Sequence, residues 1–171
     1  MQRSVVTLTL IVGLSLFLAC TTGTPTSVAG TVAPAGTAAY ERAGFETRLD
    51  KGGRLWVFES SSQALSDYDS KGAPAVHTVR PLAGPGGITI KAVEGRTIDA
   101  YLLARPGFVT RIDKRGHLWV FAAGSPELSQ FDTKGAPAVH TVRPLAGPNR
   151  MTIKAVEGAT IDQYMQADPY L

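Results

Sequence analysis

One segment of fifteen residues, KGAPAVHTVRPLAGP, occurs twice in the chain, at 71–85 and again at 134–148. The two copies lie about 63 residues apart, and the similarity extends beyond them, because GFETRLDKGGRLWVF at 44–58 returns as GFVTRIDKRGHLWVF at 107–121. Roughly two thirds of the aligned positions are identical over the whole unit. The chain is therefore a tandem duplication, and whatever one unit folds into is built twice.

The residue patterns of one unit predict two hairpins, each followed by a helix. Alternating residues at 45–49 and the apolar run at 55–58 flank a turn that keeps a glycine in both copies. Ser125 and Pro126 are typical of a helix start, and Gly135 of a helix end. The β-rich runs at 75–82 and 88–93 form the second hairpin, and a capping box at Thr160, with Thr97 in the other copy, opens the second helix.

Each unit is thus predicted to be β-β-α-β-β-α, and two units give an α+β fold with antiparallel sheet and helices packed on one face. The sequence leaves open whether the strands form one sheet or two four-stranded layers. A unit of about 63 residues is marginal by itself, since the chain offers neither disulfides nor an obvious metal cage. We therefore expect repeat 1 (40–106) and repeat 2 (107–171) to pack as one pseudo-twofold domain.

The N-terminus has the pattern of an export signal. After Arg3, residues 5–19 form an uncharged apolar run of about fifteen residues, shorter than the roughly twenty that span a bilayer. The run ends at Cys20, the only cysteine, so no disulfide can form within the chain. Residues 16–20, Leu-Phe-Leu-Ala-Cys, resemble the lipobox of bacterial lipoproteins.

The resemblance implies that residues 1–19 are a signal peptide and that Cys20 is acylated and becomes the first residue of the mature chain. We expect an exported protein held on a bacterial membrane by this lipid; in a Gram-negative cell, Thr21 implies the outer membrane, facing the periplasm. The alternative is an ordinary secretory signal cut near Ala19, which leaves Cys20 as a free thiol. Residues 20–39, rich in Thr, Ala, Gly and Pro, are predicted to be the lipidated cysteine and a flexible tether.

The charge of the chain does not predict a polyanion-binding surface. Without Arg3, sixteen basic residues stand against fourteen acidic ones, and they are scattered along the sequence. Nucleic acid is therefore not an expected partner.

The candidate ligand-binding residues are the repeated cations of the identical block: His77 and Arg80 in repeat 1, His140 and Arg143 in repeat 2. An imidazole and a guanidinium could together bind a carboxylate, sulfate or phosphate group. Residues three apart in a regular strand point to opposite faces, however, so each pair shares a pocket only if Pro81 or a bulge twists the chain. The alternative is structural, with half-buried histidines and solvated arginines; the same block and the second hairpin also repeat Lys71, Lys134, Lys91 and Lys154.

Trp56 and Trp119 lie in the run Leu-Trp-Val-Phe, which is apolar on both faces and predicts a central strand covered on each side. We expect at least one of them to be buried and the other to be partly exposed between the repeats, although stacking on sugar rings is an alternative. No compact metal-ligand pattern is present in the sequence, so neither a metal nor a cofactor is expected.

The sequence does not predict an enzyme. It contains no Gly-x-Ser-x-Gly elbow, phosphate loop or Cys-His pair, and its repeated acidic residues have structural explanations in turns and first helical turns. We expect a membrane-anchored envelope lipoprotein that serves as a non-catalytic binding or scaffold module for a protein or glycan partner. One alternative is a periplasmic protein that binds a small anion or a metal between the repeats, and a weaker one is a hydrolase without a recognisable motif.

Overall fold

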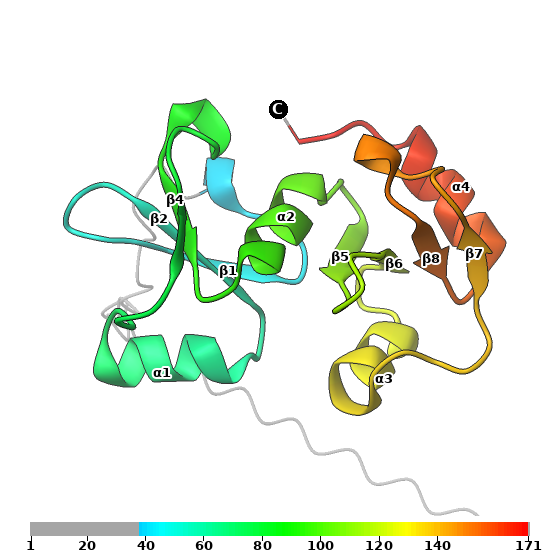
Figure 1. The fold of residues 1–171 in the computed structure, drawn as a ribbon, viewed down its shortest axis with the longest axis horizontal. Coiled ribbons are helices and arrows are strands. Elements are labelled where there is room, and N and C mark those ends of the chain that lie inside the picture. Colours follow the sequence, from blue (N-terminus) through cyan, green and yellow to red (C-terminus); the bar gives the residue numbers. More distant parts are fainter. Residues whose placement is uncertain (1–37, 171) are drawn as a thin grey trace, which may run out of the picture. The chain divides into compact units, whose positions relative to one another are not determined.

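The computed structural model describes residues 38–170, so the expected signal peptide, Cys20 and most of the tether lie outside the described residues. Figure 1 shows two similar units of strands and helices, which confirms the predicted α+β duplication. Repeat 1 contains η1 (Ala38–Tyr40), β1 (Phe45–Leu49), β2 (Leu55–Glu59), α1 (Gln63–Lys71), β3 (Thr78–Arg80), η2 (Pro85–Gly87), β4 (Ile90–Ala92) and α2 (Gly95–Leu103). Repeat 2 contains β5 (Phe108–Ile112), β6 (Leu118–Ala122), α3 (Pro126–Lys134), β7 (Thr141–Arg143), η3 (Pro148–Arg150), β8 (Ile153–Ala155) and α4 (Gly158–Gln166).

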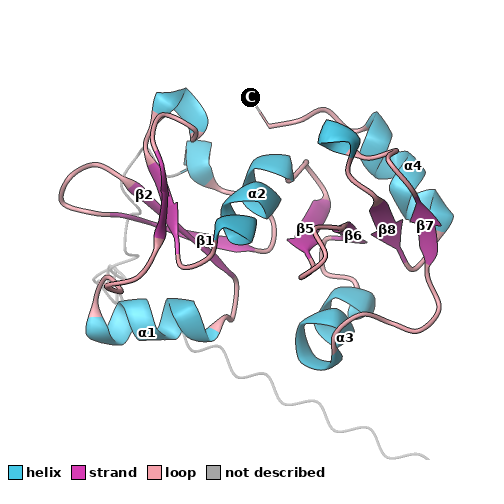
Figure 2. Cartoon of the chain, viewed as in Figure 1, coloured by secondary structure: helices cyan, strands magenta, loops and turns pink. Residues whose placement is uncertain are grey.

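Each repeat forms its own four-stranded sheet, in the orders β1-β2-β4-β3 and β5-β6-β8-β7. Figure 2 shows the second of these orders across repeat 2. Both predicted hairpins are antiparallel, but the central pair of each sheet, β2 with β4 and β6 with β8, is parallel. The sheets are therefore mixed and not antiparallel throughout. The reason is that no hairpin joins β2 to β4: α1 and β3 lie between them in the sequence, and β3, which is antiparallel to β4, returns the chain before β4 runs parallel to β2.

The helices lie on both faces of each sheet, whereas the sequence led us to expect one face. Leu55 and Val57 of β2 belong to the core beneath α2, together with Ile98. Trp56, between them in sequence, places its ring 5.2 Å from the ring of Tyr68 on α1. Because neighbouring strand residues point to opposite faces, this apolar run requires a helix on each side.

The ends of α1 and α3 lie where the sequence predicts them. Ser62 and Ser125 cap the two helices through their side-chain oxygens, and Gly72 and Gly135 close them with φ values of 84° and 81°. The second pair of helices differs from expectation, since α4 begins at Gly158 and not at the capping box of Thr160, and α2 likewise begins before its threonine. Their N-cap residues are glutamates that make no side-chain capping bond.

Contacts between the repeats join residues from both ends of repeat 1 to β5, the first strand of repeat 2. The Thr110 hydroxyl donates to the carbonyl oxygen of Ala100 at 2.6 Å, and Gly44 lies directly against the Val109 side chain. A twofold axis would produce every such contact a second time with the repeats exchanged. A Cβ placed on Gly107, the counterpart of Gly44, would have no atom of residues 38–170 within 4 Å. The expected pseudo-twofold arrangement is thus replaced by a head-to-tail one.

Each repeat has its own hydrophobic core, and three side chains connect the two. Ile112 packs against both cores, Leu103 packs against the core of repeat 2, and Tyr170 returns from the C-terminus to the core of repeat 1. The Tyr170 ring also lies 3.9 Å from the guanidinium of Arg42. These contacts join the repeats, and folding of 40–171 as one cooperative domain stays a prediction.

Candidate functional site

The most exposed large apolar side chains of the fold lie along strand β3 and its two flanks, and again along β7. Val76 and Val139 are each 83% exposed, and Val79 and Val142 are exposed in the strands themselves. Both strands are the outer strands of their sheets, so one side of each is free of a neighbouring strand within the described residues. We call Val76, Val79 and Leu82 the apolar edge of repeat 1, and Val139, Val142 and Leu145 the apolar edge of repeat 2.

Leu82 and Leu145 adopt a backbone conformation that leucine seldom takes. Their φ values are 56° and 55°, in the left-handed region, and each directly follows a proline. Glycine or asparagine is the usual residue at such a turn position, because a side chain there costs about 1 to 2 kcal/mol. The side chains are 76% and 61% exposed, so packing within the protein does not offset that cost. Backbone strain of this kind clusters at functional sites in proteins.

His77 and His140 occupy equivalent structural positions. The His77 ring lies 4.9 Å from the Trp56 ring, and the His140 ring 4.8 Å from the Trp119 ring. Nδ1 of His77 is 3.0 Å from the carbonyl oxygen of Pro74. A carbonyl oxygen only accepts, so this nitrogen carries the proton and donates. Each histidine is therefore half-buried with one ring nitrogen satisfied, as the structural interpretation predicts.

Arg80 and Arg143 pair with carboxylates on the other side of the sheet. The Arg80 guanidinium donates to both oxygens of Asp99 in α2, with one contact at 2.8 Å, and Arg143 pairs in the same way with Asp162 in α4. Histidine and arginine of one repeat thus lie on opposite faces, as their spacing predicts for a regular strand. The structure does not bring them together, and a role for these four residues in ligand binding stays a prediction.

Lys91 belongs to a polar cluster on the α1 side of the sheet. Its ammonium lies 5.1 Å from the centre of the Trp56 ring and 3.3 Å from Oδ2 of Asp50. Burial alone would raise the pKa of Asp50, but donors from the backbone of Arg54 and Gly52 and from Lys91 lower it to about 2. The cluster is consistent with a fixed ion pair that orders the β1–β2 turn.

The equivalent cluster of repeat 2 has different hydrogen bonds, since His117 replaces Arg54 and the Lys154 ammonium lies 3.8 Å from Oδ2 of Asp113. Nε1 of Trp119 donates to Oδ2 of Asp113 at 3.2 Å, whereas Nε1 of Trp56 is buried and has no hydrogen-bond partner among residues 38–170. Both tryptophans are buried, so neither is partly exposed as we expected for one of them. Burial leaves no ring face for a sugar to stack on.

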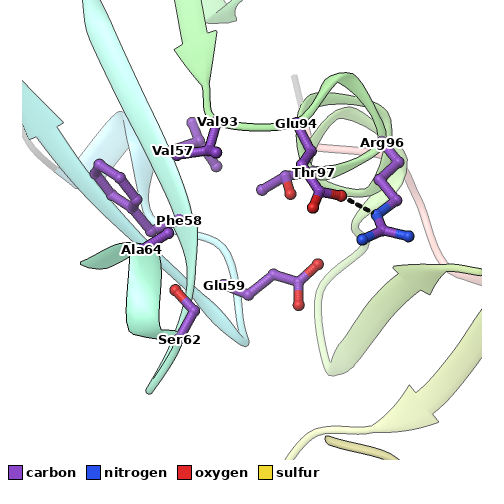
Figure 3. Close-up of a pocket in the computed structure, with 9 residues that line it drawn as sticks. All are labelled: Val57, Phe58, Glu59, Ser62, Ala64, Val93, Glu94, Arg96 and Thr97. Carbon is purple, nitrogen blue, oxygen red and sulfur yellow. Dashed lines mark ion pairs between the residues drawn. The ribbon is translucent and has the colours of Figure 1, made fainter. Parts of the chain in front are cut away.

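A small pocket opens between the first turns of α1 and α2, and Figure 3 shows the residues that line it. Its volume is about 140 Å³, below the roughly 300 Å³ of typical ligand sites. Glu94 pairs there with Arg96, and burial raises the pKa of Glu59. Repeat 2 has an equivalent pocket in which Glu157 corresponds to Glu94, but Ala122 and Ala159 replace Glu59 and Arg96, so the Glu94–Arg96 ion pair and the Glu59 carboxylate are not shared by the two units.

A larger groove of about 590 Å³ lies where the repeats meet. Arg111 is only 3% exposed there, and its guanidinium contacts Glu59 at 3.3 Å and Asp132 at 3.1 Å. The arginine also donates to the backbone oxygen of Gly44 at 3.4 Å. With its charge satisfied by two carboxylates, Arg111 serves the junction between the repeats.

Within residues 38–170, no group of three or more His, Cys, Asp or Glu side chains is placed to hold a metal ion. None of the helices in that range has the length and apolar character to cross a bilayer.

The apolar edges were missed from the sequence, which directed attention to the cations of the same block. The sequence did mark this segment, since 71–85 and 134–148 form the longest identical run of the two units, but only the structure shows that most of it is exposed. The helix just before it, α1, differs from α3 at most positions although both fill the same place in the fold. Since the fold accepts different residues in this helix, folding alone does not explain why the exposed segment after it is identical in the two repeats.

Comparison with known proteins gives no further guide, since no protein-family model, no curated protein and no solved structure matches the chain.

Proposed function

We propose that this protein is an exported, lipid-anchored protein of the bacterial envelope whose folded part binds a protein partner without catalysis. The apolar edges of the two repeats are its contact surfaces. The observation that carries the proposal is the pair Leu82 and Leu145, strained and exposed at equivalent positions. Such residues stabilise neither repeat, and an apolar partner would supply the burial that they lack.

The chemistry of the edges favours a protein over a glycan. Their exposed side chains are aliphatic, and both tryptophans are buried beneath the helices. Sugars are recognised by aromatic faces and by groups of hydrogen-bonding side chains, which the edges do not present. Two equal surfaces on one chain also suit a partner with two equal sites, because the second contact then forms at a high effective concentration.

The anchoring part of the proposal is supported by the lipobox-like sequence that ends at Cys20. The test is to follow the wild-type chain and Cys20→Ala in the bacterial envelope. We expect the wild-type chain in the membrane fraction, with an N-terminal peptide that carries acyl groups by mass spectrometry. Cys20→Ala should leave that fraction; an unmodified Cys20 in the mature wild-type chain would reject the lipid anchor.

The binding part is tested by site-specific photo-crosslinking in the intact envelope. A photoreactive residue replaces Val76 or Val139 in the full chain, and the matched controls carry it at Lys51 or Lys114, which are equivalent exposed turn residues outside the block. We expect the same protein adduct from both valine positions and none from the controls. Adducts of equal yield at all four positions, or none at the valines, would contradict the proposal.

A further inference from the structure

The junction between the repeats joins two complementary faces of the unit. We call Gly44, Glu59 and Ala100 of repeat 1 the tail face, because they receive repeat 2. The head face of repeat 2 consists of Val109, Thr110 and Arg111, which contact Gly44, the Ala100 carbonyl and Glu59. All three head-face residues are buried in this junction.

Since the unit is duplicated, the chain carries a second copy of each face that is not used in this junction. The second head face, in repeat 1, consists of Glu46, Thr47 and Arg48, counterparts of the buried trio. The second tail face, in repeat 2, consists of Gly107, Ala122 and Gln163. A head-to-tail junction is heterologous, so in principle the free head face of one chain fits the free tail face of another.

The residues that differ between used and free faces are the ones that oppose such a contact. Glu46 stands where Val109 packs on glycine, and its side chain is 50% exposed beside Arg48. Gln163 takes the position of Ala100, whose small side chain leaves room for the Thr110 hydroxyl. Ala122 takes the position of Glu59, so the free tail face lacks the carboxylate that Arg111 contacts in the junction. Burying the Glu46 carboxylate in such a contact would remove its hydration, and its single 3.4 Å contact with Arg48 would not compensate for that loss.

We propose that the free head and free tail faces keep the backbone geometry of the junction, and that Glu46, Ala122 and Gln163 are what prevent a second copy of this chain from joining through them. The array then stops at two repeats, because the end faces differ from the faces of the junction, as the terminal repeats of repeat proteins do. The inference rests on the junction itself and does not depend on the proposed function. The contact that would form is a continuation of the interface already present inside the chain.

The test restores the junction residues on the free faces of the full chain, with Cys20→Ala so that no lipid contributes to association. E46V opens the head face, A122E/Q163A opens the tail face, and the triple variant opens both. Light scattering after gel filtration, over a range of concentrations, measures the mass. We expect the parent chain to be a monomer and the triple variant to form linear assemblies that grow with concentration. The dissociation constant for self-association of the triple variant should be at least tenfold lower than that of the parent. E46V mixed with A122E/Q163A should give heterodimers.

Gly107 supplies the matched control, because it is the counterpart of the glycine that Val109 contacts. G107A added to the triple variant places a methyl group where the new valine must approach, while nothing within 4 Å opposes it in the monomer. We expect this fourth change to restore the monomer. A monomeric triple variant would overturn the proposal, as would association that G107A leaves unchanged or a parent chain that already joins through these faces.

Discussion

A Cβ atom placed on Gly44 would lie 2.9 Å from Cγ2 of Val109 and closer still to Cγ1, so the backbone of repeat 1 touches a side chain of repeat 2 at a site that admits only glycine. Gly44 also has a φ of 77°, a value that its counterpart Gly107 shares at 81°. The two glycines therefore differ in their surroundings and not in their backbone conformation.

This difference predicts unequal effects of the same substitution. G44A should lower the free energy of unfolding by about 3 kcal/mol, because strain at positive φ adds to overpacking against Val109. G107A should cost only about 1 kcal/mol, since it meets the strain alone. Urea unfolding of both variants measures the two values. Equal losses would mean that the repeats do not pack at Gly44.

The tryptophans predict a second matched pair. W119F removes a buried hydrogen bond to Asp113 and leaves that carboxylate with one donor fewer, whereas W56F removes a buried N–H that has no partner. Both variants lose the same apolar area. We therefore expect W119F to be less stable than W56F by about 1 kcal/mol, measured by chemical unfolding. The reverse order would indicate that the Trp56 nitrogen is satisfied in solution.

Asp50 predicts a defined dependence of stability on acid. Its pKa of about 2 in the fold lies below its ordinary value of 3.8, so the carboxylate stabilises the fold above pH 4, and this contribution is lost as the pH falls toward 2. Other carboxylates titrate in the same range, so the measured quantity is the difference in unfolding free energy between the wild type and D50N. The wild type should be more stable than D50N by about 2 kcal/mol at pH 6, and this difference should shrink toward zero at pH 2. A difference independent of pH would show that the charge of Asp50 does not matter.

The apolar edges predict substitutions that leave the fold intact. L82G and L145G relieve a strained backbone but increase the freedom of the unfolded chain, so thermal unfolding should give stabilities within about 1 kcal/mol of the wild type. Leu55→Gly, at a buried position of β2, is the contrasting control and should cost more than about 4 kcal/mol. A large loss in L82G would mean that the leucine is part of the core.

Local patterns in the sequence predicted the elements of this fold, and long-range relations largely escaped them. The hairpin turn at Asp50 and the Ser125–Pro126 helix start depend on neighbouring residues, and they were confirmed. The parallel pairing of β2 with β4 joins strands that are separated in the sequence by α1 and β3, and the head-to-tail junction depends on where α2 lies against β5. No short sequence pattern specifies either relation. The run Leu-Trp-Val-Phe did contain the correct information, since its two apolar faces required helices on both sides.

The candidate site was only partly accessible to sequence reasoning. The spacing of His77 and Arg80 correctly indicated opposite faces, and the structure supplies their partners, Trp56 and Asp99. The exposure of Leu82 could not be predicted, because an apolar residue after a strand is normally expected to be buried. Its positive φ is visible only in the structure, and neither core packing nor the backbone preference of leucine explains a leucine at this position.

The most direct test of the central claim is the crosslinking yield from Val76 and Val139 in chains that carry L82G, L145G or both. If the apolar edges are two equivalent partner surfaces, L82G lowers the adduct at Val76, L145G lowers the adduct at Val139, and the double variant loses both while it unfolds at the same temperature as the wild type. Undiminished adducts from the folded double variant would contradict the account.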